Sequence, residues 1–231
     1  MSKNKKLGKC THCMLDKILT REHVISRNLF PKGYLKKNPI IVPVCRDCNN
    51  GYSKDEEYFR NFVNALSIES SKEAGNLLFS KIKRSMQRRP AIHKKAMDSM
   101  ELVNLYSKSG IYLGRKTKIS ISEDDWKRYH NILDKYIKGL FFHEFKTCFP
   151  EDHRMKHIFG DKNNKNHTNM LEHINKWNLD NKEVFFHGYN FIPDSFESMW
   201  ASTFFNTVFF VTLVTTEEKY NQFEKESKNK K

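Results

Sequence analysis

The chain has 231 residues and a formal net charge of +14 at pH 7. Such an excess of lysine and arginine favours a polyanionic partner, with nucleic acid as the first expectation and an anionic membrane surface as the second. The most apolar run, residues 199–214, is broken by polar side chains and is shorter than the roughly 18 to 20 residues of a membrane-spanning helix. The basic N-terminus lacks the apolar core of a signal peptide. Together these features predict a cytoplasmic protein with no membrane partner.

Four of the five cysteines form two Cys-x-x-Cys pairs, Cys10 with Cys13 and Cys45 with Cys48. In a reducing compartment this spacing indicates a metal site rather than disulfides. Two residues between ligands let both sulfurs of a pair reach one ion, and four thiolates suit tetrahedral Zn2+. We therefore predict one structural zinc ion with no open coordination position, and we expect Cys148 to lie in the core.

Two further segments surround the second cysteine pair: EHVISRNLFP lies between the pairs, and CNNGYSKDEEYF begins at the last cysteine. A Cys-x-x-Cys pair, then Glu-His followed by an apolar residue, then Cys-x-x-Cys-Asn running into a helix resembles the zinc-containing HNH endonucleases, in particular a bacterial free-standing subgroup. These motifs cover about residues 10–60, and KGLFFHEF and SMWASTFFNTVFF show a weaker likeness. The resemblance implies a ββα-metal module that cleaves nucleic acid.

The resemblance also implies roles for three residues: His23 as the general base, and Glu22 with Asn49 as ligands of a catalytic divalent ion. An imidazole with a pKa of about 6.5 can take a proton from water at neutral pH. Mg2+ or Mn2+ prefers carboxylate and amide oxygens and can neutralise the charge that develops on the phosphate. Neighbouring strand residues point to opposite faces, so a bend is needed to aim Glu22 and His23 at one point. Asn50 is the alternative to Asn49, which could instead cap the following helix.

Two positions depart from the family pattern. Ile40 stands where the motif has its middle asparagine, and the nearest asparagine, Asn38, is out of register. Ser26 stands where a proline is common. Neither change removes an implied metal ligand, but the group that orients His23 is left unidentified.

Two helical segments are predicted after the last cysteine pair. Ser53 is an N-cap candidate with Glu56 as its capping-box partner, and apolar residues recur from there at helical spacing. A second helix is predicted over residues 71–89, and Pro90 ends or kinks it. Its basic end is either a solvated face or a strip that contacts phosphates. The candidates for nucleic-acid contacts are Arg27, Lys54, Lys81, Lys83, Arg84, Arg88 and Arg89.

The second half of the chain mixes strand and helix patterns. Alternation indicates a strand within residues 111–121, and Ser122 is the expected cap of a long amphipathic helix. Residues 150–180 are polar, with GDKNNKNH as a loop. Strands are predicted over residues 183–192, 200–205 and 208–214, with a turn at Asn206 and Thr207. The aromatic residues of these segments are assigned to the core.

Together these patterns predict an α+β fold. A zinc-stapled ββα-metal (HNH) module is expected over residues 1–66, a helical and antiparallel-sheet domain over 67–221, and a disordered lysine-rich tail over 222–231. The predicted function is hydrolysis of phosphodiester bonds, with DNA as the substrate by resemblance alone and host defence by analogy. The alternatives are a non-catalytic zinc-ribbon protein that binds nucleic acid, and an adaptor in a larger complex.

Overall fold

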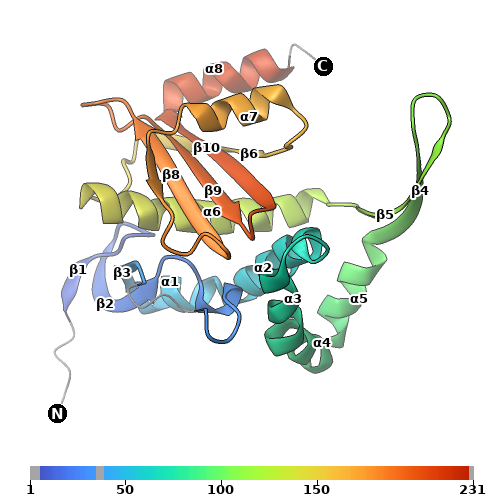
Figure 1. Ribbon diagram of the computed structural model, residues 1–231. Helices are drawn as coiled ribbons and strands as arrows, with labels where there is room; N and C mark the ends of the chain where they lie inside the picture. The colour runs from blue at the N-terminus through green and yellow to red at the C-terminus, as the bar shows by residue number, and fades with distance from the viewer. Residues whose placement is uncertain (1–5, 35–38, 229–231) are drawn as a thin grey trace.

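The computed structural model describes residues 6–34 and 39–228 of the chain. Its centre is a five-stranded antiparallel sheet with the strand order β6-β10-β9-β8-β7 (Figure 1). The strands are β6 (His153–Phe159), β7 (Lys176–Asn178), β8 (Phe185–Phe191), β9 (Ser198–Phe204) and β10 (Val208–Thr216). The mixture of helices and antiparallel strands confirms the predicted α+β class.

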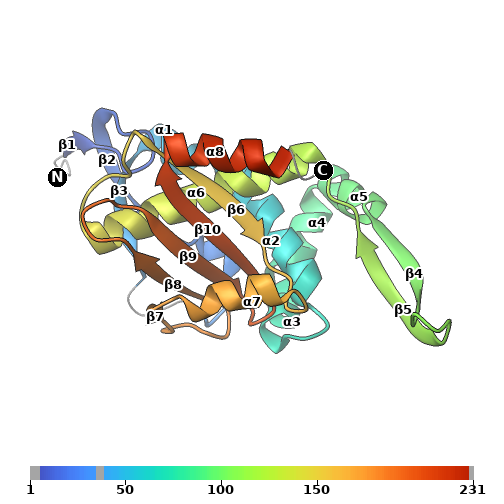
Figure 2. The ribbon, with the colours of Figure 1, turned by 90° about the horizontal axis from the view of Figure 1, so that it is seen from above.

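Helices cover both faces of this sheet. Helices α2 (Ser53–Ser67) and α6 (Glu123–Phe145) lie on one face, and α7 (Lys165–Glu172) and α8 (Glu217–Lys228) lie on the other, as Figures 1 and 2 show. Strands β9 and β10 are therefore buried almost throughout. A strand covered on both faces carries a continuous apolar run instead of an alternating one, which explains the apolar stretch that the sequence places there.

Helix α6 joins the sheet to the N-terminal part of the chain. It begins as predicted at Ser122, whose Oγ accepts a hydrogen bond from the backbone N–H of Asp125 at 3.2 Å. The core beneath it is aromatic, since the ring of Phe59 in α2 lies between 5.3 and 5.9 Å from the rings of Tyr136, Phe204 and Phe210, centroid to centroid. The aromatic residues assigned to the core are buried or half-buried: Phe141, Phe142, Phe204, Phe205, Phe209 and Phe210.

The N-terminal module consists of a small sheet followed by a helix. Strands β1 (Leu7–Lys9), β2 (Asp16–His23) and β3 (Ile41–Cys45) are antiparallel in that order, and α1 (Arg46–Gly51) follows β3 directly. A short 3-10 turn, η1 (Arg27–Leu29), follows β2. Helix α6 packs closely against the module, because a Cβ added at Gly139 would lie 2.8 Å from both methyl carbons of Val24.

The segment between α2 and α6 holds a bent helical rod and a hairpin. The rod consists of α3 (Lys72–Leu77), a π-helical turn η2 (Leu78–Ile82), α4 (Lys83–Arg88) and α5 (Pro90–Asp98). Pro90 is the first residue of α5, so it breaks the predicted helix as expected. Strands β4 (Met100–Tyr106) and β5 (Tyr112–Ile119) form a two-stranded hairpin that extends away from the body in both Figure 1 and Figure 2.

Two sequence-based predictions are wrong in detail. Ser53 is the first residue of α2 and not its cap, and no side chain caps this helix; the carboxylate of Glu56 bonds to Ser26 and Lys135 instead. The tail is not disordered over residues 222–228, which belong to α8, where Glu224 pairs with Lys156 at 2.8 Å. The structure also adds strands β4, β6 and β7 and helix α7, which the sequence patterns did not predict.

Among the described residues, no helix combines the length and the apolar character needed to cross a lipid bilayer. A single cluster of buried apolar side chains runs from Cys10 in the module to Val214 in β10. The module and the sheet are therefore packed around a common core, and α6 is the element shared between them.

Candidate metal centre and active site

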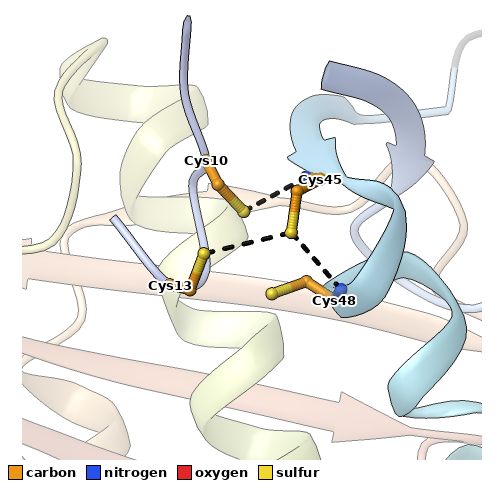
Figure 3. A group of neighbouring side chains, drawn as sticks. All are labelled: Cys10, Cys13, Cys45 and Cys48. Atoms are coloured by element: carbon orange, nitrogen blue, oxygen red, sulfur yellow. Dashed lines mark hydrogen bonds between the residues drawn. The ribbon is translucent and has the colours of Figure 1, made fainter. Parts of the chain in front are cut away.

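The four paired cysteines converge at one point of the N-terminal module (Figure 3). Cys10 and Cys13 lie in the turn between β1 and β2, Cys45 ends β3, and Cys48 lies in α1. Their sulfur atoms all lie within 4.8 Å of one another, and Sγ of Cys13 is 3.9 Å from Sγ of Cys45. Four sulfurs bound to zinc at about 2.3 Å stand about 3.8 Å apart at the corners of a tetrahedron. The cluster is therefore compatible with a structural zinc ion.

Backbone amides support the sulfur atoms of this cluster. The N–H of Cys45 donates to Sγ of Cys10 at 3.2 Å, and the N–H of Cys48 donates to Sγ of Cys45 at 3.5 Å. Burial raises the pKa of Cys10, but backbone hydrogen bonds outweigh it and lower this pKa to about 7. Burial and the neighbouring thiols raise the pKa of Cys48. Each thiolate makes the next harder to form, so a central cation is needed to hold all four deprotonated.

His23 is the last residue of β2 and lines a small cavity between the module and strand β8. The cavity has a volume of about 40 Å³, which is enough to hold water. Burial lowers the pKa of His23, and the positive charges of Arg27 and Arg21 lower it further. His23 is therefore neutral at pH 7 and able to accept a proton from water.

Asn49 lies in α1 and faces strand β2. Its Nδ2 donates to Oγ1 of Thr20 at 3.0 Å and reaches the carbonyl of Arg21 at 3.5 Å. The amide of Asn49 is thus held beside the residue that precedes Glu22. Asn50 is exposed, so Asn49 is the one of the two asparagines that contacts the strand. The out-of-register Asn38 lies outside the described residues.

Glu22 points away from His23 and into a buried charge cluster. Its Oε2 lies 2.8 Å from Nε2 of His12, and its Oε1 lies 2.6 Å from Nζ of Lys135 in α6. Lys135 also pairs with Glu56 of α2, and Glu56 accepts a hydrogen bond from Oγ of Ser26 at 2.8 Å. Glu22 and His23 are adjacent at the end of β2, and strand alternation places them on opposite faces, with Glu22 at Lys135 and His23 at the cavity. Both carboxylate oxygens of Glu22 are therefore engaged.

This charge cluster was not predicted. Lys135 is only 1% exposed in its side chain, although it sits on a helix whose other buried residues are mostly apolar. A lysine inside the apolar face of an amphipathic helix is the one signal that could have pointed to it, because a buried ammonium needs carboxylate partners. Among the described residues, the four cysteines are the only group of three or more His, Cys, Asp or Glu whose ligand atoms lie close enough to hold a metal ion.

The predicted basic contacts fall into two sets. Arg27 and Lys54 are exposed at η1 and at the start of α2, and the carbonyl of Arg27 accepts a hydrogen bond from Nζ of Lys81 at 2.9 Å. Four of the other candidates line one cleft beside α2: Lys81, Arg84, Arg88 and Arg89. Lys83 lies on the same helix as Arg84 but does not line the cleft.

Comparisons with protein-family models, with curated proteins and with solved structures found no match. The likeness to HNH endonucleases is therefore carried by the motifs of residues 10–60, and the chemistry of the site follows from its own residues.

Replacing Lys135 with methionine is expected to lower the free energy of unfolding by about 3–5 kcal/mol. The side chain is shared by Glu22 and Glu56, and its removal leaves the buried carboxylate of Glu22 and the half-buried carboxylate of Glu56 without their shared cation. Urea denaturation of the zinc-loaded protein measures the change.

Lys127→Met is the matched control, because Lys127 lies on the same helix with a side chain 73% exposed. Its loss should change the free energy of unfolding by less than about 0.5 kcal/mol. Neutralising the carboxylates as well, with Glu22→Gln and Glu56→Gln beside Lys135→Met, should restore much of the loss. Equal stability of Lys135→Met and Lys127→Met would show that the cluster has no role in holding α6 on the module.

Proposed function

We propose that the protein is an endonuclease of the HNH type that hydrolyses phosphodiester bonds of DNA. The observation that carries the proposal is the arrangement of β2, β3 and α1 around the four-cysteine cluster, which holds Asn49 against β2 beside the Glu22–His23 pair. The ββα-metal motif consists of two antiparallel strands followed by a helix, and here the four cysteine thiols join these elements. The net charge of +14 supports a nucleic-acid substrate.

Each part of the module has a proposed role. Cys10, Cys13, Cys45 and Cys48 bind a structural Zn2+, which has no open position for chemistry. His23 takes the proton from the attacking water, since burial and neighbouring arginines keep its imidazole neutral. We also propose that the protein acts in the cytoplasm, because this reducing compartment keeps the cysteines as thiols that can bind zinc.

A catalytic divalent ion is the third part of the proposal. An Mg2+ or Mn2+ ion held by Glu22 and Asn49 would stabilise negative charge on the phosphate. In the described conformation, however, Glu22 is paired with Lys135 and His12, and Asn49 donates from its amide nitrogen. Ion binding at Glu22 therefore requires this carboxylate to exchange a partner, and the proposed ion is inferred from the motif resemblance.

The same pairing favours a second candidate function. A non-catalytic zinc-containing protein that binds nucleic acid needs the cysteine cluster and the basic surface but no metal ligand at Glu22. In such a protein the Glu22–Lys135 pair is a structural link between the module and α6.

Incubation of supercoiled plasmid with the zinc-loaded protein separates the two functions. With Mg2+ or Mn2+ the endonuclease should produce nicked or linear DNA with 5′-phosphate and 3′-hydroxyl ends, and without added divalent ion it should not. The ion-free arm omits the ion, because a strong chelator would also remove zinc from the cysteines. Single-stranded DNA and RNA are run beside the plasmid. If the protein binds the plasmid but the plasmid stays supercoiled both with Mg2+ and with Mn2+, the binding function is supported and the endonuclease is not.

A further inference from the structure

A cleft beside α2 gathers positive charge away from the cysteine cluster. It has a volume of about 320 Å³. Five of its lining side chains are cationic and one is a carboxylate, which leaves an excess of four positive charges (five minus one). The cations are Arg60, Lys81, Arg84, Arg88 and Arg89, and the carboxylate is Glu57.

The charges reach the cleft because two helical faces meet there. Lys81, Arg84 and Arg88 follow one another at intervals of three and four residues, which places them on one side of the η2–α4 segment. Glu57 and Arg60, three residues apart on α2, form the opposite wall. The arrangement is therefore fixed by backbone elements and not by flexible loops.

The single carboxylate cannot neutralise the cleft. Glu57 is 2.5 Å from Nη1 of Arg89 and 3.8 Å from Nη2 of Arg60, and it also accepts a hydrogen bond from Ser85. Within the described part of the chain, the guanidinium groups of Arg84 and Arg88 have no hydrogen-bond or ion-pair partner. Toward the described residues, these two guanidinium groups at the concave surface therefore keep their donors free.

Arg60 shows that the site is built into the fold. It is only 5% exposed, and its Nε and Nη2 donate to Oδ1 of Asn61 at 3.1 and 2.8 Å. Burial lowers the pKa of Arg60, and burial followed by the charges of Arg60 and Arg27 lowers the pKa of Lys81. Positive charges that disfavour one another in this way are stabilised by an anion bound among them.

We propose that this cleft binds a phosphate group of the nucleic-acid backbone. Arginine presents two parallel donors that match the oxygens of a phosphate, and the cleft supplies several of them at one point. Its Lys81 donates to the carbonyl of Arg27 in η1, the turn that follows His23 and β2. A strand anchored here is held next to the module. The identity of the ligand rests on the proposed function, whereas the anion site rests on the cleft itself.

Fluorescence anisotropy with a labelled DNA duplex tests the proposal. The full-length, zinc-loaded His23→Ala protein is the background, so that the duplex is not cut. Adding Arg84→Ala with Arg88→Ala should weaken binding at least about tenfold near 0.15 M salt, and the slope of log K against log salt should fall by about 1, the value for one phosphate contact. Both arginines are exposed, so the variant should unfold at the same temperature as its background.

Lys83→Ala is the matched control, since it removes a cation from the same helix outside the cleft. Its effect on affinity should be less than about twofold. If the double arginine variant behaves like Lys83→Ala, the cleft does not bind the backbone and the proposal is overturned.

Titration with inorganic phosphate and with a mononucleotide distinguishes the sources of the phosphate group. Loss of nucleotide binding in the double variant, with DNA binding unchanged, would assign the cleft to a free phosphate compound and would overturn backbone binding. Arginine-dependent DNA binding by a wild-type protein that cuts no substrate would support the cleft and refute the endonuclease. DNA cleavage by the wild type, with no effect of the two arginines on DNA binding, would support the endonuclease and refute the cleft as a binding site.

Discussion

Replacing Cys45 with serine should release the zinc ion and unfold the N-terminal module. Cys45 is 2% exposed, ends β3, and its Sγ accepts the N–H of Cys48 at the start of α1. Structural zinc contributes on the order of 10 kcal/mol to the folding of small domains, and a module with a three-stranded sheet has little core of its own to replace it. We expect bound zinc to fall from about one ion per chain to nearly none, with a large drop in melting temperature.

Elemental analysis and thermal denaturation followed by circular dichroism measure these changes. Cys148→Ser is the matched control, because Cys148 is half-buried and lies outside the cluster. It should retain the zinc of the wild type and nearly the same melting temperature. A Cys45→Ser protein that keeps its metal and its melting temperature would contradict the assignment of the cluster as a structural zinc site.

The cysteine cluster and helix α6 were predictable because their signals are local. Two residues between paired cysteines already bring two sulfurs together, and the preference of four thiols for one tetrahedral ion predicts that the pairs meet. Ser122 and the apolar face that follows it predict both the start and the orientation of α6. In each case the deciding residues lie within a few positions of one another.

The environment of Glu22 was not predictable for the opposite reason. Its carboxylate is paired with Lys135, which lies in helix α6 far along the chain, and no local sequence pattern indicates such a partner. The same lysine explains why the expected capping box failed: Glu56 gains a buried cation and the hydroxyl of Ser26, which outweigh a bond to a helix end.

Strand β6 was missed because its residues are polar, and its polarity is satisfied by contacts such as His157 with Asp134 at 2.8 Å.

The alternation of β2 has a consequence for the proposed chemistry. With Glu22 facing α6 and His23 facing the cavity, the two halves of the implied Glu-His site lie on opposite sides of one strand. The pocket beside His23 is partly open to solvent and has a volume of about 40 Å³, enough to hold the attacking water. A phosphodiester cleaved at His23 would therefore approach from the open side of this pocket.

The His23→Ala variant is expected to cut plasmid DNA about 10²–10⁴-fold more slowly than the wild type, the usual contribution of a general base. Zinc content and affinity for DNA should be retained, because His23 contacts neither the cysteine cluster nor the basic cleft. His173→Ala is the matched control, since His173 is an exposed histidine at the end of α7. It should cleave at the wild-type rate.

The pH dependence of cleavage identifies the imidazole more directly than the loss of activity does. Burial, with Arg27 and Arg21, lowers the pKa of His23 below the ordinary value of a histidine, about 6.5. The neutral form accepts the proton, so the wild-type rate should hold as the pH falls to 6.5 and decline only below it. This acid limb should disappear from any residual activity of His23→Ala and persist in His173→Ala. If His23→Ala kept both the rate and the acid limb of the wild type, His23 would not be the general base.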